Sequence, residues 1–121
     1  MKINRKLNLT RLIVRKNKVE IVICSAIWYK DLPTAKFNPI NINRGIVVEG
    51  HRHADIIRTV LNLLNKRTVQ FGEDSVGETI QGFVTNTHRF VDRIEAKIIA
   101  TNSNQIIEET NFNELYSEDI Y

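Results

Sequence analysis

Gly50–Asp55, which reads Gly-His-Arg-His-Ala-Asp, is the densest group of side chains in the chain that could do chemistry. His51 and His53 with Asp55 could begin a metal site if a further ligand, such as His88, came from elsewhere in the fold. A histidine of this group could instead act as a general base. The metal site needs a ligand that the local spacing does not supply, so we expect no metal here.

The same cluster lies where a strand is expected to pass into a helix. His53 or Asp55 could therefore cap the first turn, whose main-chain N–H groups have no partner within the helix. A helix N-terminus beside the Arg52 guanidinium is also suited to an anion. We favour a capping or ligand-contact role over metal binding, and an anion site is the functional interpretation that we prefer.

A second cluster joins Gln81–Thr85 (Gln-Gly-Phe-Val-Thr) to Arg89–Arg93 (Arg-Phe-Val-Asp-Arg). It offers an aromatic ring, hydroxyl and amide groups and two guanidinium groups around a second expected helix start. A nucleotide needs this set, with a stacking surface for its base and donors for its phosphates. From spacing alone, the favoured alternative is that Phe83 and Phe90 belong to the core and that Arg93 lies on an exposed helix surface.

The third cluster is Glu114–Tyr121, where acidic and aromatic side chains alternate. Such a segment could dock against a partner subunit, close over a pocket or fray. Its apolar side chains make a wholly free tail a poor interpretation, because they have surface to bury. These side chains are Leu115, Tyr116, Ile120 and Tyr121.

The usual enzyme motifs are missing from the sequence. It has no glycine-rich phosphate loop, no cysteine pair for zinc and no Gly-x-Ser-x-Gly elbow. The single cysteine, Cys24, excludes an intrachain disulfide and suits a reducing compartment. Because Cys24 lies in the apolar run Val19–Tyr29, we expect a buried and inert thiol. We therefore expect a binding protein without a cofactor.

Charge is distributed unevenly along the chain. Residues 1–18 carry seven basic side chains and no acid, whereas residues 104–121 carry five acids and no base. A basic arm could bind nucleic acid. We expect instead a solvated strand or tail, or charge matching between subunits, because the arm has no aromatic residue for base stacking.

The spacing of apolar residues indicates how these clusters are positioned. Strands are predicted at Leu9–Val14, Val19–Tyr29, Gly45–Glu49, Thr79–Thr85 and Arg89–Val91. Helices are predicted at Ala54–Asn65 and from Asp92 to about residue 103, with Asp92 and Glu95 at capping-box spacing. A long loop, Asp31–Arg44, connects the second and third strands.

We therefore predict an α+β fold, an antiparallel sheet packed by two main helices in one domain of 121 residues. The domain would carry a basic N-terminal arm or strand at residues 1–18 and an acidic, aromatic C-terminal segment at residues 113–121. No run is long enough to span a membrane, and the charged N-terminus lacks the features of a signal peptide. We expect a cytoplasmic protein.

Taken together, these clusters resemble a family of short phage proteins. The resemblance rests on five stretches that run from about Ile21 to Tyr121, namely Gly50–Asp55, Gln81–Thr85, Arg89–Ala96, Gln105-Ile106 and Leu115–Tyr121. That family includes the first described class of phage anti-Thoeris sponge proteins. Ala54 stands where the family pattern has glycine, and the Asp31–Arg44 loop is longer than usual.

The resemblance implies a function in an infected bacterial cell. Sponge proteins of this kind sequester cyclic ADP-ribose-type immune signals made by bacterial TIR enzymes, and some members also hold cyclic oligonucleotides in higher oligomers. We therefore expect a homo-oligomer, a dimer or larger, that binds such a signal without cleaving it. The expected ligand contacts are Arg52, His53, Asp55, Phe83, Thr85, Arg89, Asp92 and Arg93, with Phe83 stacking on a base.

Two other classes remain open at this stage. One is a hydrolase of the same signals that uses His51, His53 or His88. The other is a nucleic-acid-binding accessory protein that uses the basic arm. A sponge needs tight binding and no activated nucleophile, which agrees with the groups that the clusters contain and lack.

Overall fold

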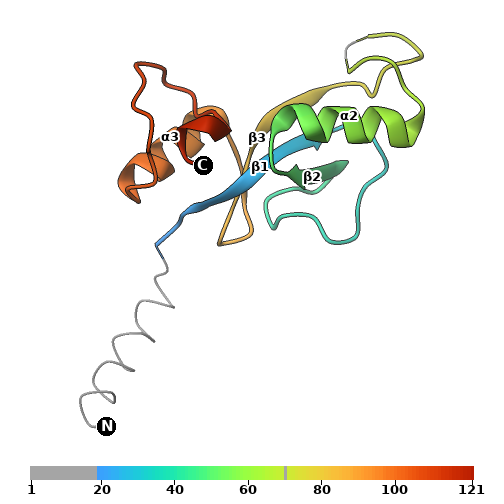
Figure 1. The fold of residues 1–121 in the computed structure, drawn as a ribbon. Helices are drawn as coiled ribbons and strands as arrows, with labels where there is room; N and C mark the ends of the chain where they lie inside the picture. Colours follow the sequence, from blue (N-terminus) through green and yellow to red (C-terminus); the bar gives the residue numbers. More distant parts are fainter. Residues whose placement is uncertain (1–18, 70) are drawn as a thin grey trace, which may run out of the picture.

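The computed structural model describes residues 19–69 and 71–121, which form a four-stranded sheet and two helices (Figure 1). In chain order, the elements are β1 (Val22–Tyr29), β2 (Ile46–Gly50), α2 (His53–Leu64), β3 (Thr79–Thr85), β4 (Phe90–Asp92), α3 (Arg93–Asn102) and the short 3-10 helix η1 (Ser117–Asp119). The strands are ordered β2-β1-β3-β4, and every neighbouring pair is antiparallel. The predicted α+β fold is confirmed, while the predicted strand Leu9–Val14 lies outside the described residues.

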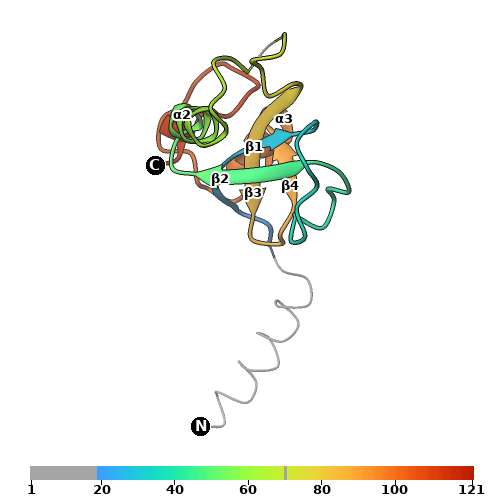
Figure 2. The ribbon, with the colours of Figure 1, turned by 90° about the vertical axis from the view of Figure 1, so that its right-hand side faces the viewer.

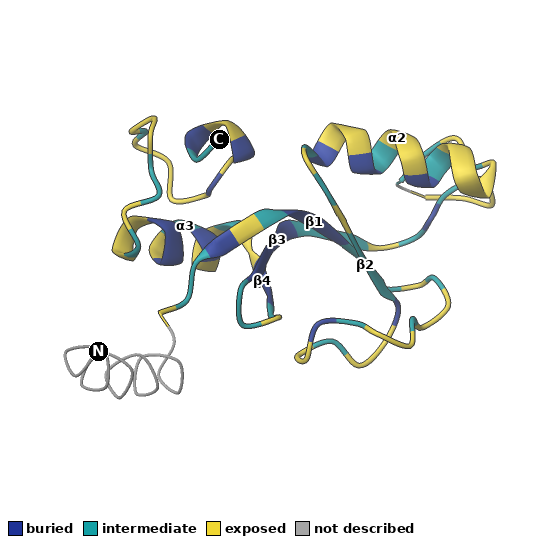
Figure 3. Ribbon diagram, turned by 60° about the horizontal axis from the view of Figure 1, so that its bottom comes forward, coloured by how far each residue is buried: buried dark blue, intermediate teal, exposed yellow. Residues whose placement is uncertain are grey.

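Both helices pack on the same face of the sheet, α3 towards one end of it and α2, which is seen end-on in Figure 2, towards the other (Figures 1 and 2). Ser25 of β1 pairs with Phe83 of β3, so alternation places Phe83 and Ile27 on one face. Phe83 packs with Ala96 and Ile99 of α3, whereas Ile27 packs beneath α2. Figure 3 shows the same arrangement, with the sides of the helices that face the sheet buried and their outer sides exposed.

The opposite face of the sheet has its own apolar layer. Ala26, Val84 and Phe90 are buried there, and Ile42 from the long loop packs against them. Gly82 belongs to this face, and a Cβ atom added to it would lie 2.0 Å from the main-chain oxygen of Val91. The close approach of β4 therefore requires glycine at this position, because any side chain would push β4 away.

The helix starts differ in how they are capped. The Asp92 carboxylate accepts a hydrogen bond of 2.8 Å from the N–H of Glu95, which confirms the predicted cap of α3. Helix α2 follows Arg52 and has no side-chain cap. The expectation that His53 or Asp55 caps α2 is therefore wrong, and both side chains have other partners.

Residues 114–121, called here the C-terminal segment, lie between α2 and α3 (Figures 1 and 3). Leu115 is fully buried in the same core cluster as Phe83, and Ser117 and Asp119 of η1 are buried as well. The segment thus docks on its own chain and is not a frayed tail. Within the described residues, no helix is both long and apolar enough to cross a membrane.

Candidate ligand-binding site

Arg52, at the start of α2, holds the far end of the C-terminal segment. Its guanidinium donates to the Ser117 hydroxyl at 2.7 Å and to the main-chain oxygen of Tyr121 at 2.8 Å. The same group lies 5.0 Å from the centre of the Tyr121 ring and 3.7 Å from the Glu118 carboxylate. One guanidinium therefore combines hydrogen bonds, a cation–π contact and a long ion pair.

Arg93, the first residue of α3, holds the near end of the segment in a similar way. Its guanidinium donates to the main-chain oxygen of Leu115 at 2.7 Å and to the Gln81 amide oxygen at 2.6 Å, and it lies 4.6 Å from the centre of the Tyr116 ring. Burial lowers the pKa of Arg93 from its usual value. Arg93 forms none of the ion pairs found among residues 19–69 and 71–121, although the more distant carboxylates of Glu114, Glu118 and Asp119 partly offset its charge.

His53, the first residue of α2, is buried against β3. Its Nε2 atom is 2.7 Å from the main-chain oxygen of Gly82, and its ring meets the Phe83 ring edge-on at 5.1 Å. Burial lowers the pKa of His53, so the ring is neutral near pH 7 and Nε2–H donates to Gly82. This nitrogen is therefore occupied in a structural hydrogen bond and is not a free base.

Phe83 requires a correction. Base stacking on Phe83 needs an exposed ring, but the Phe83 side chain is 0% exposed and packs among Val22, Val91 and Leu115, as the core alternative predicts. The helix-covered face of the sheet is its core face, and the C-terminal segment completes the cover. No base can stack on Phe83 while that cover is in place.

Thr85 and Arg89 belong to a different cluster, at the β3–β4 hairpin. The Glu20 carboxylate accepts hydrogen bonds from the Thr85 and Thr87 hydroxyls and two more from the Arg89 guanidinium, at 2.6–2.8 Å. Arg89 also donates to Glu95 at 2.7 Å. These bonds, led by Arg89, lower the pKa of Glu20 to about 2. The cluster ties residues before β1 to the hairpin.

Asp55 and Asp92 have separate local roles. Asp55 is exposed on the first turn of α2 and pairs with Arg58 at 2.7 Å. Asp92 caps α3 and also lines a surface hollow beside Arg93. Of the eight predicted contacts, the structure gathers Arg52, His53, Phe83 and Arg93 around the C-terminal segment, with Asp92 next to them.

The hollow beside Arg93, called here the Arg93 hollow, has a volume of about 390 Å³. Its lining combines a guanidinium, an amide, two carboxylates and one apolar side chain. These belong to Gln81, Asp92, Arg93, Ile94 and Glu114. Cationic and hydrogen-bonding groups are thus gathered at one open concave surface.

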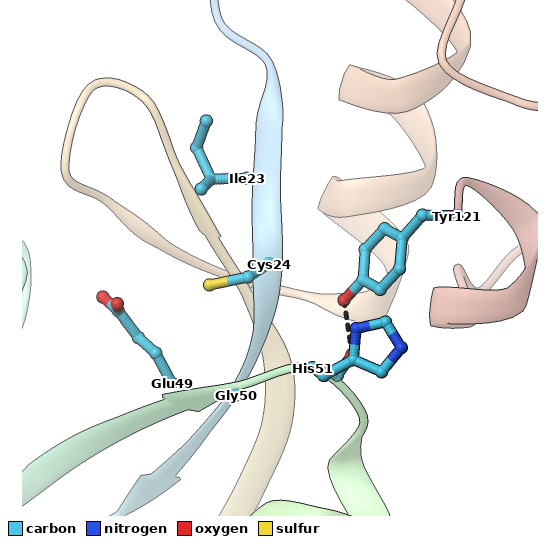
Figure 4. Close-up of a pocket in the computed structure, with 6 residues that line it drawn as sticks. All are labelled: Ile23, Cys24, Glu49, Gly50, His51 and Tyr121. Carbon is cyan, nitrogen blue, oxygen red and sulfur yellow. Dashed lines mark hydrogen bonds between the residues drawn. The ribbon is translucent and has the colours of Figure 1, made fainter.

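A second hollow, of about 360 Å³, lies where β2 leaves the edge of β1 (Figure 4). Figure 4 shows the Cys24 sulfur on the side of Glu49 and the His51 ring beside Tyr121, whose hydroxyl donates to the main-chain oxygen of His51 at 2.6 Å. Cys24 is partly exposed here, so its predicted full burial is wrong. Burial of the thiol and the nearby Glu49 charge still raise the pKa of Cys24, which keeps the thiol protonated.

Sequence reasoning missed this second hollow because its walls come from three separate segments. The three histidines lie in different surroundings. His51 lines this hollow, His53 is buried, and His88 is exposed in the β3–β4 turn with φ of 60°. Within the described part of the chain, no three His, Cys, Asp or Glu side chains are grouped so as to hold a metal ion.

The fold and this site together define a small α+β protein in which two arginines hold an acidic C-terminal segment beside an open polar hollow. The chain belongs to the phage T4 y16D protein family, whose model matches residues 21–121. The resemblance to a family of phage proteins is confirmed at that level, over the same part of the chain. No curated protein and no solved structure matched in the corresponding comparisons.

Proposed function

We propose that this protein is a phage-encoded sponge, which binds a nucleotide signal of the cyclic ADP-ribose type and sequesters it without cleavage. The proposal rests on the burial and the surroundings of Arg93. It is a partly buried cation that forms no ion pair within the described residues, and it lines a hollow of about 390 Å³. Small-molecule sites commonly have volumes of about 300–1,000 Å³.

The other groups of the Arg93 hollow suit the remainder of such a ligand. A guanidinium binds phosphate oxygens through two parallel hydrogen bonds. The Asp92 and Glu114 carboxylates are acceptors for ribose hydroxyls, and the Gln81 amide can serve either as donor or as acceptor. Ile94 adds an apolar contact for a base or a sugar ring.

The candidate nucleophile and base elsewhere in the fold favour binding over turnover. The Cys24 thiol has a raised pKa, and a protonated thiol is a poor nucleophile. The Nε2 atom of His53 is engaged by Gly82. A sponge requires ligand affinity and has no need of an activated nucleophile, which is the chemistry that these residues support.

The direct test is a calorimetric titration of the purified protein with cyclic ADP-ribose, repeated with Arg93→Gln. Loss of a charge-assisted contact of roughly 1.5–3 kcal/mol should weaken binding about tenfold to a hundredfold. Arg58→Gln is the matched control, because Arg58 is an exposed arginine of α2 and should leave affinity unchanged. No binding by the parent protein, or equal loss in both variants, would contradict the proposal.

A hydrolase of the same signals is the second candidate, favoured by one observation. His51 lines a hollow with Cys24 and Glu49, and its ring makes no hydrogen bond to the residues that the structure describes. The two candidates separate after incubation, when the protein is denatured and the recovered ligand is analysed by mass spectrometry. Intact ligand supports the sponge, and ligand altered by the parent but not by His51→Ala supports the hydrolase.

A further inference from the structure

The C-terminal segment covers the same arginines from which ligand binding is expected. Arg52 is engaged by Ser117 and Tyr121, and Arg93 by Leu115. The segment also brings acidic side chains close to these cations, with the Glu118 carboxylate 3.7 Å from Arg52. An anionic ligand that used both arginines would have to take the place of part of the segment.

Building on the proposed function, we infer that residues 117–121 compete with an anionic ligand for Arg52. In this arrangement the end of the segment releases Arg52 when a phosphate-bearing ligand binds. Arg52, at the start of α2, then contacts the ligand from one end of the segment, and Arg93, at the start of α3, lines the hollow at the other end. The chemical class of the ligand is a polyanion such as a pyrophosphate or a dinucleotide.

The two halves of the C-terminal segment are held by different forces. Leu115 is 0% exposed in the apolar core, and its N–H donates to the main-chain oxygen of Arg93 at 2.9 Å. Removing a buried leucine from a core costs about 2–5 kcal/mol. Leu115 therefore remains in place and anchors the segment.

Beyond Tyr116, Ile120 packs against the edge of the core, and the other contacts described are mainly polar. The Tyr121 hydroxyl contacts the N–H and hydroxyl of Ser25 at 3.1 and 2.9 Å and donates to His51 at 2.6 Å. The main-chain oxygen of Asp119 accepts from Ile107 at 2.7 Å. Each such bond contributes only about 0.5–1.5 kcal/mol net, because water replaces it on release. Release after Tyr116 exchanges these bonds for bonds to water and to the ligand, whereas release of Leu115 would expose a buried apolar side chain to water.

The ligand would provide Arg52 with better partners than the segment does. In the structure, the guanidinium donates to one hydroxyl and one main-chain oxygen, and the Glu118 carboxylate is beyond hydrogen-bonding distance at 3.7 Å. A phosphate group offers two charged oxygens in the geometry of a guanidinium fork. Movement of Glu118 and Asp119 away from the site would also remove their repulsion of an anion.

The experiment loosens residues 117–121 without touching the arginines. Tyr121→Phe removes the hydroxyl contacts but keeps the ring over Arg52, and Ser117→Ala removes an acceptor of Arg52. Tyr29→Phe is the matched control, since it removes the hydroxyl of another tyrosine, one that is buried beneath α2. Each full-length variant is titrated with inorganic pyrophosphate and with cyclic ADP-ribose, and hydrogen exchange is followed at the amides of Asp119, Ile120 and Tyr121.

We expect both loosened variants to bind pyrophosphate roughly two- to tenfold more tightly than the parent, because the competing closed state is less populated. The control should bind as the parent does, and ligand should accelerate exchange at the three amides of the parent. Unchanged or weaker binding by both loosened variants, or slower exchange with ligand, overturns the inference. If pyrophosphate behaves as expected but cyclic ADP-ribose binds to none of the proteins, the inference stands and the proposed signal is wrong.

Discussion

At the scale of single residues, the predicted ligand contacts are divided between two polar networks. Arg52 and Arg93 engage the C-terminal segment, whereas Thr85 and Arg89 engage Glu20. Residue type and spacing identified which side chains carry charge and hydrogen-bonding capacity. They did not identify the partners, because Glu20 and Ser117 lie 65 residues away from Thr85 and Arg52, respectively.

The Glu20 cluster predicts a specific loss of stability in acid. The pKa of Glu20 is lowered from 4.5 to about 2 in the fold, so the unfolded chain takes up the proton first as the pH falls. The stability that this carboxylate contributes is therefore complete above pH 4.5 and is lost between pH 4.5 and about 2. Denaturant unfolding of the parent and Glu20→Gln across this range measures it.

At pH 7, Glu20→Gln should lower the free energy of unfolding by roughly 1.5–3 kcal/mol, because it weakens several charge-assisted hydrogen bonds. Glu78→Gln is the control, since Glu78 makes a single ion pair with Lys30 and is 61% exposed. Such surface pairs contribute about 0–1 kcal/mol. Equal losses in the two variants would show that the Glu20 cluster is no stronger than an ordinary surface pair.

For Tyr29 we expect a loss of stability in alkali, in contrast to the loss in acid expected for Glu20. Its hydroxyl is buried without a hydrogen-bond partner among the described residues, and burial raises the pKa of Tyr29 from 10.0 to about 12. A buried unsatisfied hydroxyl costs about 1–3 kcal/mol, so Tyr29→Phe should be as stable as the parent or more stable at pH 7.

The stability contributed by neutral Tyr29 is complete below pH 10 and is lost as the pH rises from 10 towards 12, because the unfolded chain releases the proton first. Thermal unfolding of Tyr29→Phe should therefore show a flatter pH dependence in this range. A strongly destabilised variant at pH 7 would mean that the hydroxyl has a partner after all.

At the scale of elements, the sequence predicted the strands and helices of the described residues to within about three residues, because runs of β-branched residues and a 3.6-residue apolar period mark them. It did not predict the bulge of β1 between Val22 and Cys24, or how the open edges of the sheet are closed. The Gln105 amide pairs with both main-chain groups of Val22 at 2.8 and 2.7 Å. The Asn41 amide does the same for Phe90 of β4.

These amides explain two features that sequence patterns left open. The long loop at residues 31–44 supplies Asn41 and Ile42 to the sheet, so it has a structural role at β4 and on the second face. Gln105 follows α3 and occupies the edge of β1 beyond the end of β2. A single side chain that hydrogen-bonds to the edge of a strand leaves no periodic pattern in the sequence. Only the structure therefore reveals it.

At the scale of the whole molecule, the outer surface of α3 is the strongest indication of self-association. Ile94 and Ile98 lie one turn apart on this helix and are 54% and 58% exposed. Phe112, from the loop that precedes the C-terminal segment, is 65% exposed. Exposed apolar side chains on the outer surface of a helix are typical of an interface.

We therefore expect a homo-oligomer in which the outer surface of α3 contacts a second copy, and the opposite charges of residues 1–18 and 104–121 favour such pairing. Sedimentation velocity at micromolar concentration should show a dimer or larger species for the parent. Ile98→Lys places a charge in the interface and should shift the protein towards monomer. Leu63→Lys is the matched control, because Leu63 is an exposed apolar residue of the other helix, α2. A parent that sediments only as monomer would exclude the oligomer, and equal dissociation by both variants would place the interface elsewhere than α3.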